Sequence, residues 1–402
     1  MHDLSTLEGR SVVMLSWRDT RNPEGGGAER YLESMATGLA AIGARVTVFC
    51  AAHAYAPKDE VVDGVRFVRR GNRLTIYLRG MLALLLGRLG PLGRYDLVVD
   101  VQNGMPFLAR LVTRRPVVVL VHHVHREQWH VVMPGPLAAV GWWIESSLAP
   151  RIYRGDQYVA VSHATRRELR GLGVEGPRVA VVHNGTSPRL DVPQGKAAAP
   201  TLAVVGRLVP HKQVEQAIDT ALALRAEFPD LRLHVVGAGW WGDTLHRYAV
   251  DHGAGDTVVF EGHVDEERKH EIYAQAWVLV VPSLKEGWGL VIPEAGSHGT
   301  PAVAYRSAGG TRESIADGQS GLLVDDPVGL TAAVDRLLHD RRLRDQLGRG
   351  AVEHSSSFTW QQAQHAFAVV MVAALEGQRI GGEDPEEEVL GRIDEAGMPP
   401  AV

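Results

Sequence analysis

The chain has 402 residues, a net charge of −5 and a single cysteine, Cys50, so it is long enough for two or three domains with cores of their own. One cysteine excludes an internal disulfide framework, a zinc ribbon and a dithiol redox site. The first residues lack a basic stretch followed by an apolar segment, and the longest uncharged apolar stretch, residues 131–144, contains two prolines. We therefore expect a soluble cytoplasmic protein without a signal peptide or a membrane-spanning helix.

The charge is distributed unevenly along the chain. Residues 1–190 contain 24 Lys and Arg against 16 Asp and Glu, whereas residues 191–376 contain 16 against 24. A basic first half favours an anionic partner, such as a phosphate or a membrane surface, or it attracts the acidic second half. No nucleic-acid recognition motif accompanies the basic residues, so we expect no nucleic-acid partner.

Short apolar runs alternate with amphipathic stretches of helical length. In the first half they predict a helix over residues 28–42 and strands at residues 11–16, 45–50, 97–101, 117–121, 157–161 and 179–182. The second half repeats the rhythm with strands at residues 202–206, 231–237, 258–261, 278–281, 302–305 and 321–324. Valine-rich runs of this length are typical of parallel strands buried on both faces. This pattern therefore predicts a doubly wound α/β sheet in each half of the chain.

Changes in composition divide the chain into segments. Residues 186–200 are rich in proline, alanine and polar residues and have no period, which indicates a linker. We expect an N-terminal domain over residues 1–190, a C-terminal domain over residues 191–357, an amphipathic helix over residues 358–376 that packs back on the first domain, and a disordered acidic tail over residues 377–402. Ligands of two such sheets bind beside the carboxyl ends of the strands.

Glycines and cations follow two of the expected strands. Gly25, Gly26 and Gly27 lie between the first strand and the first helix, where free N–H groups bind an anion or the glycines simply form a flexible turn. Arg207 and Lys212 follow the first strand of the second half. Two cations at the carboxyl end of a strand suit a diphosphate, and a solvated loop is the alternative.

Two further segments of the second half contain glycines or carboxylates in positions that suit ligand binding. Gly237 and Gly239 form a short turn after a strand, of the kind that lets a nucleotide approach the backbone. Glu286 and Glu294 lie eight positions apart, and Pro293 suits the first turn of a helix, where the carboxylate of Glu294 is favoured. Such carboxylates accept hydrogen bonds from adjacent sugar hydroxyls, or they are a helix cap and an unrelated surface acid.

The order of these motifs resembles that of family-four glycosyltransferases, which are retaining enzymes with the GT-B fold. The resemblance covers roughly residues 11–376 and rests on GGGAE, VHH, VSHATRREL, HNG, VGRLVPHK, GAG, PSLKEGWGLVIPE, AGG and GQSGLLV. It implies two facing Rossmann-like domains with a cleft between them. One departure is Ser187, which stands where the family often has an aspartate after its Asn-Gly turn.

The resemblance implies a role for each motif position. Arg207 and Lys212 would grip the donor diphosphate, Glu294 the ribose of the nucleotide and Glu286 the hydroxyls of the transferred sugar. His122 would face the sugar, so that the catalytic residues would be His122, Glu286, Arg207 and Lys212. The other donor-binding residues would be Gly26, Gly27, Gly237, Gly239, Gly287, Trp288, Gly289 and Leu290.

The alignment of the histidine motif is ambiguous. His123 and His125 compete with His122, because VHHVH permits more than one register. The acceptor side would be lined by His123, His125, Arg126, Glu127 and Trp129. The chain contains no Asp-x-Asp pair of the kind that holds a metal in other glycosyltransferases. The resemblance therefore implies a metal-independent enzyme without a cofactor, in which the two cations stabilise the leaving group.

The predicted function is a retaining hexosyltransferase that moves a sugar from a UDP- or GDP-linked donor to a hydroxyl of a glycolipid, a glycan or a small molecule. The alternatives are a nucleotide-sugar epimerase or hydrolase, and a non-catalytic nucleotide-sugar binding protein. The intact pairs Arg207 with Lys212 and Glu286 with Glu294 argue against both alternatives.

A leucine-rich segment raises a separate question. Residues 74–92 contain Arg79 and Arg88, and four more arginines lie within residues 66–73. A basic amphipathic helix of this kind can lie on an anionic membrane, here as a peripheral contact at the inner membrane face. The alternative is the buried face of a helix within the domain.

Overall fold

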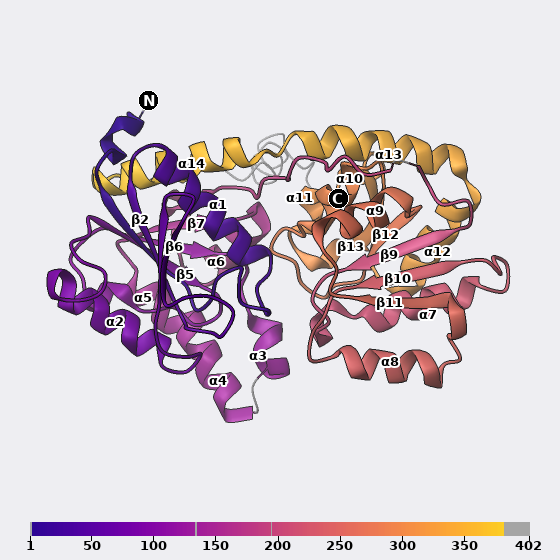
Figure 1. Cartoon of the computed structure of the whole chain (residues 1–402), viewed down its shortest axis with the longest axis horizontal. Coiled ribbons are helices and arrows are strands. Elements are labelled where there is room, and N and C mark those ends of the chain that lie inside the picture. The colour runs from indigo at the N-terminus through magenta and orange to yellow at the C-terminus, as the bar shows by residue number, and fades with distance from the viewer. Residues whose placement is uncertain (1, 133–134, 194, 382–402) are drawn as a thin grey trace, which may run out of the picture.

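The computed structural model describes residues 2–132, 135–193 and 195–381, which form two α/β domains side by side (Figure 1). In the described parts of the first domain, eight strands form one sheet in the order β3-β4-β2-β1-β5-β6-β7-β8, parallel except for β3. The strands are β1 (Ser11–Leu15), β2 (Arg45–Cys50), β3 (Asp59–Val62), β4 (Val65–Arg69), β5 (Leu97–Gln102), β6 (Val117–Val121), β7 (Gln157–Ala160) and β8 (Val179–Val181). The helices are α1 (Gly27–Ala41), α2 (Ile76–Leu86), α3 (Arg126–Val132), α4 (Gly135–Trp143), α5 (Ala149–Ile152) and α6 (His163–Gly171).

The second domain repeats the arrangement. Within the described residues its sheet has six parallel strands in the order β11-β10-β9-β12-β13-β14. They are β9 (Thr201–Val205), β10 (Arg232–Val236), β11 (Val258–Gly262), β12 (Val278–Val281), β13 (Ala302–Tyr305) and β14 (Gly321–Val324). The helices around them are α7 (Val214–Leu224), α8 (Gly242–Asp251), α9 (Glu266–Gln275), α10 (Val291–Gly296), α11 (Thr311–Ser314), α12 (Pro327–His339) and α13 (Arg341–Ser356).

The predicted fold class, two doubly wound α/β domains, is confirmed. Each predicted strand begins and ends within one residue of its expected place. In register, Val13 at the centre of the first sheet lies between Thr47 and Val98. Both faces of these strands are buried beneath helices, in separate apolar clusters, which explains why they are nearly continuous runs of valine and leucine.

The hairpin of β3 and β4 is a feature that the prediction missed. Asp63 and Gly64 connect the two strands with φ angles of 49° and 78°, as a two-residue type I′ turn requires. The sequence VVDGVRF contains this Asp-Gly signal. The exposed, acidic β3 covers the edge of β4, where an unpaired strand would otherwise be open to other chains.

Helix α14 (Trp360–Leu375) returns to the first domain after α13 has run along the second, so the two helices lie along the top of both domains in Figure 1. It begins with a capping box in which Thr359 and Gln362 exchange hydrogen bonds of 3.1 and 3.2 Å. Its buried residues, Phe367 and Met371 among them, join the apolar cluster of α1 and the first sheet. A Cβ atom on Gly38 of α1 would lie 2.5 Å from the side chain of Gln364, so glycine allows the two helices to pack closely.

The predicted disordered tail starts too early in the sequence. Within residues 377–381, the backbone N–H of Ile380 donates to Gln157 at 2.8 Å, and Arg379 donates to the carbonyl oxygen of Gly155. These residues therefore contact the first domain, and the prediction of disorder is wrong for them. The rest of the predicted tail, residues 382–402, lies outside the described residues. In the parts of the chain that the structure describes, no helix is both long and apolar enough to cross a membrane.

Candidate active site between the two domains

Loops from both domains meet where the domains face each other. They follow the carboxyl ends of four parallel strands and comprise residues 16–26, 122–125, 206–213 and 282–290. A Cβ atom on Gly26 would lie 3.5 Å from Nε of Arg207, and one on Gly27 would lie 3.0 Å from Cδ1 of Leu290. The glycine loop of the first domain and two motifs of the second domain therefore share one location.

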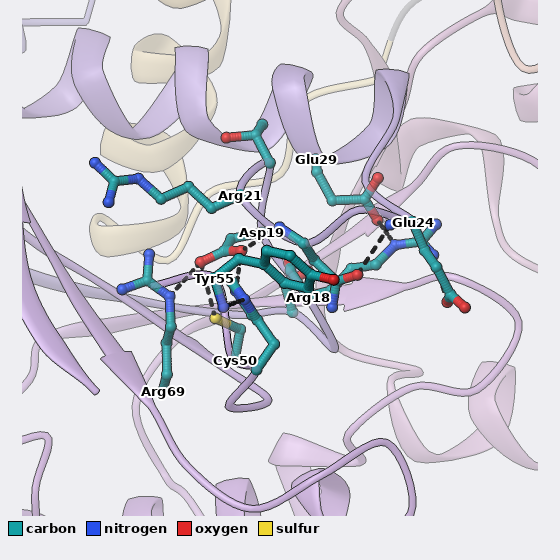
Figure 2. Close-up of polar contacts among 12 residues, drawn as sticks. Arg18, Asp19, Arg21, Glu24, Glu29, Cys50, Tyr55 and Arg69 are labelled. Carbon is teal, nitrogen blue, oxygen red and sulfur yellow. Dashed lines mark hydrogen bonds and ion pairs between the residues drawn. The ribbon is translucent and has the colours of Figure 1, made fainter. Parts of the chain in front are cut away.

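The loop between β1 and α1 is held by two buried ion pairs, those of Asp19 and Arg18 (Figure 2). Near its start, Nε of Arg69 donates to Asp19 at 2.5 Å. Nε of Arg18, also near its start, donates to Glu29 of α1 at 2.7 Å, and the other oxygen of Glu29 accepts from the backbone N–H of Gly26, at the end of the loop, at 2.7 Å. The carboxylate of Glu29, in the first turn of α1, thereby pairs the backbone N–H of the N-cap residue Gly26. The fixed loop places Gly26 beside the second domain.

Arg207 and Lys212 have different surroundings. The side chain of Arg207 is exposed, and its guanidinium has no ion pair with another described residue. Nζ of Lys212 lies 2.5 Å from Oε1 of Glu286. Burial would raise the pKa of Glu286, but Lys212 and a hydrogen bond from Ser283 outweigh it and hold this pKa below its usual value. An unpaired guanidinium near an ammonium group is suited to bind a diphosphate.

His122 lies at the end of β6, directly against the second domain. A Cβ atom on Gly287 would lie 2.3 Å from the carbonyl oxygen of His122, so glycine alone allows this approach. The ring of His122 is buried and meets the ring of Tyr31 edge to face at 5.4 Å. Burial lowers its pKa to about 4, so the ring is neutral near pH 7. Its buried Nε2 has no hydrogen-bond partner among the described residues.

The two competing histidines are held by neighbours in their own domain. Nε2 of His123 lies 2.9 Å from Oε1 of Gln128, and Nδ1 of His125 lies 3.2 Å from Oε1 of Glu145. A buried ring nitrogen without a partner suits a ligand hydroxyl, because leaving it unpaired costs free energy. Among these three histidines, only His122 has a buried ring nitrogen without a hydrogen-bond partner in the described parts of the chain.

The other acceptor-side candidates have mixed surroundings. Nε1 of Trp129 donates to the buried carboxylate of Glu145 at 2.7 Å. Arg126 is exposed, and its guanidinium lies 5.9 Å from the ring of Trp142. The side chain of Glu127 lies outside those that the structure describes. Glu145 therefore organises this side, although no sequence motif marks it.

Glu294 is held by three side chains that the sequence analysis missed. Its oxygens lie 3.2 Å from Nη1 of Arg30, 3.0 Å from the hydroxyl of Tyr273 and 3.3 Å from Nζ of Lys269. Arg30 belongs to α1 of the first domain and also donates to Oγ of Ser187 at 2.7 Å. The residue that departs from the family pattern thus supports a contact between the domains. Arg30 and Glu294 are far apart in the sequence, so no local pattern could have paired them.

Two of the predicted donor-binding residues, Trp288 and Gly289, are explained by side-chain packing and by backbone conformation. The ring of Trp288 is buried between His183 and Phe358, with ring centroids 4.7 and 4.8 Å away. Its assignment to the donor site therefore depends on its backbone. Gly289 has a φ of 85°, which favours glycine.

The glycines of the second domain's short turn are explained by packing of protein against protein. A Cβ atom on Gly237 would lie 1.9 Å from the carbonyl oxygen of Gly206, and one on Gly239 would lie 2.2 Å from that of Leu208. The close approach that glycine permits here is between the loops that follow β9 and β10. A nucleotide is not needed to explain these two glycines.

Two facing doubly wound domains, with paired carboxylate and cation motifs on the second, define a GT-B glycosyltransferase. Residues 25–190 match the family described as Glycosyltransferase Family 4, and residues 191–354 match Glycosyl transferases group 1. The D-inositol 3-phosphate glycosyltransferase of Acidothermus cellulolyticus is 30% identical, with 89% of this chain and 87% of that relative covered. The chain belongs to the family-four glycosyltransferases.

Solved structures agree with this fold. The sucrose-phosphate synthase of Thermosynechococcus elongatus matches with a TM-score of 0.75 and 20% identity, covering 96% of this chain and all of that one. Anabaena HepE, solved in complex with UDP and glucose, matches with a TM-score of 0.67 and 20% identity, covering 89% of this chain and 97% of that one. At this identity the likeness shows the fold alone.

Proposed function

We propose that this glycosyltransferase is a retaining, metal-independent hexosyltransferase that uses a UDP- or GDP-linked sugar. The observation that carries the proposal is the meeting of Arg207, the Lys212–Glu286 pair and His122 where the strands of both domains end. UDP is the first nucleotide to test, because HepE was solved with UDP. The acceptor is a hydroxyl of a glycolipid, a glycan or a small molecule.

The proposed chemistry centres on the leaving group. The bond between the anomeric carbon and the diphosphate oxygen breaks, and its electron pair leaves with the diphosphate. The acceptor oxygen bonds to the same carbon from the face that the diphosphate leaves, and the hydroxyl proton passes to the departing phosphate oxygen. Arg207 and Lys212 stabilise the charge that develops on the diphosphate.

The remaining site residues bind and orient the donor in this proposal. Glu294 accepts from the ribose hydroxyls, and Glu286 accepts from the sugar hydroxyls beside Lys212. His122, neutral near pH 7, directs its unpaired Nε2 toward the sugar. Because Glu286 is already paired with Lys212 at 2.5 Å, it is poorly suited as a covalent nucleophile. This pairing supports front-face transfer without a glycosyl-enzyme intermediate.

Product stereochemistry and metal dependence test this function together. Proton NMR of the fresh product should show the anomeric configuration of the donor, and turnover should persist in EDTA because cations of the chain stabilise the leaving group. An inverted product contradicts the retaining assignment. Complete loss of turnover in EDTA that is restored by magnesium contradicts metal independence.

We also propose that the enzyme acts in the cytoplasm and contacts the inner membrane face peripherally. The basic balance of residues 1–190 supports this location. A membrane contact suits an enzyme whose acceptor is a glycolipid.

A further inference from the structure

Helix α2 has a leucine-rich side that no part of the described protein covers. Its inner residues, Ile76, Gly80, Ala83 and Leu84, are buried against the first domain. Facing away, five leucines expose between 53% and 90% of their surface: Leu74, Leu78, Leu82, Leu85 and Leu89. Steps of three or four residues place them along one side of the helix and its extension. We call these five residues the leucine face.

The charged residues of the segment that carries the leucine face are exclusively basic. Residues 64–95 contain no aspartate or glutamate. Five exposed arginines lie within this stretch, of which Arg66 pairs with Asp59 at 4.0 Å. The other four, and two more that follow the turn at residues 109–111 that contacts α2, are Arg73, Arg79, Arg88, Arg94, Arg114 and Arg115. None of the six makes an ion pair with a carboxylate in the described parts of the chain. The apolar stripe is therefore bordered by cations whose charge is available to a partner.

We propose that the leucine face docks on the surface of an anionic lipid bilayer. Leucine side chains enter the boundary between head groups and acyl chains, while the arginines contact lipid phosphates. Both interactions are available at once, because the opposite side of α2 is fixed to the domain and holds the helix flat on the surface. An apolar stripe with a cationic border matches the two chemical layers of such a membrane.

A second copy of the chain fits this surface less well. A symmetric dimer would place each arginine border against its own copy, which is repulsive. A stable interface also needs roughly 800 Å² from each partner, more than one side of an 11-residue helix supplies. An anionic bilayer has neither restriction.

This inference deepens the proposed function and rests on it for its biological purpose. Docking through α2 holds the first domain, the proposed acceptor domain, at the membrane. The acceptor hydroxyl is then presented by a lipid-borne molecule in the same surface. The physical evidence for docking is independent of the chemistry of transfer.

Vesicle flotation tests the proposal directly. The full-length protein is mixed with phosphatidylcholine vesicles, with and without half phosphatidylglycerol. Wild type should float with the anionic vesicles and much less with the neutral ones, and rising salt should release it. The triple variant Leu78→Gln, Leu82→Gln, Leu85→Gln should partition at least about tenfold more weakly, because it removes apolar contact area.

Matched variants separate docking from general effects. Val250→Gln with Val328→Gln removes two equally exposed apolar side chains from the second domain, 77% and 79% exposed, and should float like wild type. Arg79→Gln with Arg88→Gln should reduce the preference for anionic vesicles.

Three outcomes would overturn the proposal. They are wild type that does not float with anionic vesicles, a leucine variant that floats like wild type, and a solution dimer that the leucine variant dissociates. Thermal shift with UDP on the same samples reports the donor site separately. If the protein fails to float but UDP still raises its melting temperature, the docking proposal alone is wrong. If it floats but UDP does not raise its melting temperature, the proposed function alone is wrong.

Discussion

The two sides of the candidate active site hold their polar side chains differently. On the second domain, Arg207 is exposed and unpaired among the described residues, and Lys212 shares a single close contact with Glu286. On the first domain, Gln128 holds His123, and Glu145 holds both His125 and Trp129.

This difference separates groups that await a ligand from groups that shape the protein. A charge left without a partner is available to a charged ligand, whereas a buried group with all its contacts made stabilises its own domain. We therefore expect substitutions of Arg207 and Lys212 to impair the reaction with little effect on folding. Substitutions around Glu145 should destabilise the first domain with little effect on nucleotide binding.

The largest expected effect comes from removing the cations. Arg207→Ala or Lys212→Ala should lower turnover on the order of 100-fold, because each stabilises charge that develops on the leaving diphosphate. Arg207→Lys should not restore turnover, because a point charge cannot replace a planar fork.

Steady-state kinetics with circular dichroism as a folding control checks this expectation. Arg247→Ala is the matched control, since Arg247 is also an exposed arginine of the second domain. Variants of Arg207 and Lys212 that fold and keep near-normal turnover would show that both are solvated loop charges.

Glu145 should show the opposite pattern. Its carboxylate is fully buried and accepts from the backbone of His125 and from Nε1 of Trp129. Glu145→Gln replaces one acceptor oxygen with an amide that meets another donor, which should reduce the free energy of unfolding by about 2 kcal/mol. Denaturant titration measures this loss, with exposed Glu353→Gln as control. An unchanged unfolding midpoint, or a large loss of UDP affinity, would remove the contrast between the two sides.

The pKa of His122 predicts a smaller, pH-dependent effect. Burial lowers it to about 4, so between pH 4 and 6.5 the unfolded chain binds a proton that the folded protein does not. Stability should therefore fall as the pH drops through this window and be unaffected by His122 above it. His122→Asn should remove about 1 kcal/mol of this acid destabilisation at pH 5.5.

Unfolding curves of wild type and His122→Asn at pH 5.5 and 7.5 measure that difference. His252→Asn, a change at an exposed histidine, is the control. The same pH dependence in wild type and His122→Asn would mean that the ring of His122 is accessible to protons in the folded state.

The sequence predicted most of the fold because its strands are buried on both faces. Continuous valine runs such as residues 117–121 leave few alternatives. The β3–β4 hairpin was missed because both strands are short and β3 lies at the edge of the sheet, although the Asp63-Gly64 turn marks it. For the leucine-rich segment, the sequence left open a helix on a membrane surface or a helix buried within the domain. The structure shows that one side of α2 is buried and the other is exposed.

The candidate site was predictable only where the chemistry is local in sequence. Arg207 and Lys212 share one loop, and the position of Glu286 follows from a compact motif. The contact between Arg30 and Glu294 depends on how the two domains meet, which no periodicity encodes. The role of Glu145 could not be predicted for a similar reason. A single glutamate in an apolar helical stretch does not indicate which groups donate hydrogen bonds to it.

The central claim is that the donor nucleotide binds against the second domain, with Glu294 at its ribose and Glu286 at its sugar. Titration calorimetry with UDP on wild type, Glu294→Gln and Glu286→Gln tests it most directly. Glu294→Gln should weaken UDP binding about tenfold, because it removes a charged acceptor from the ribose, while Glu286→Gln should leave it nearly unchanged. Arg30→Gln, which breaks the contact with Glu294 but keeps the carboxylate, should bind UDP like wild type. Equal UDP affinities for the two glutamate variants would contradict the account.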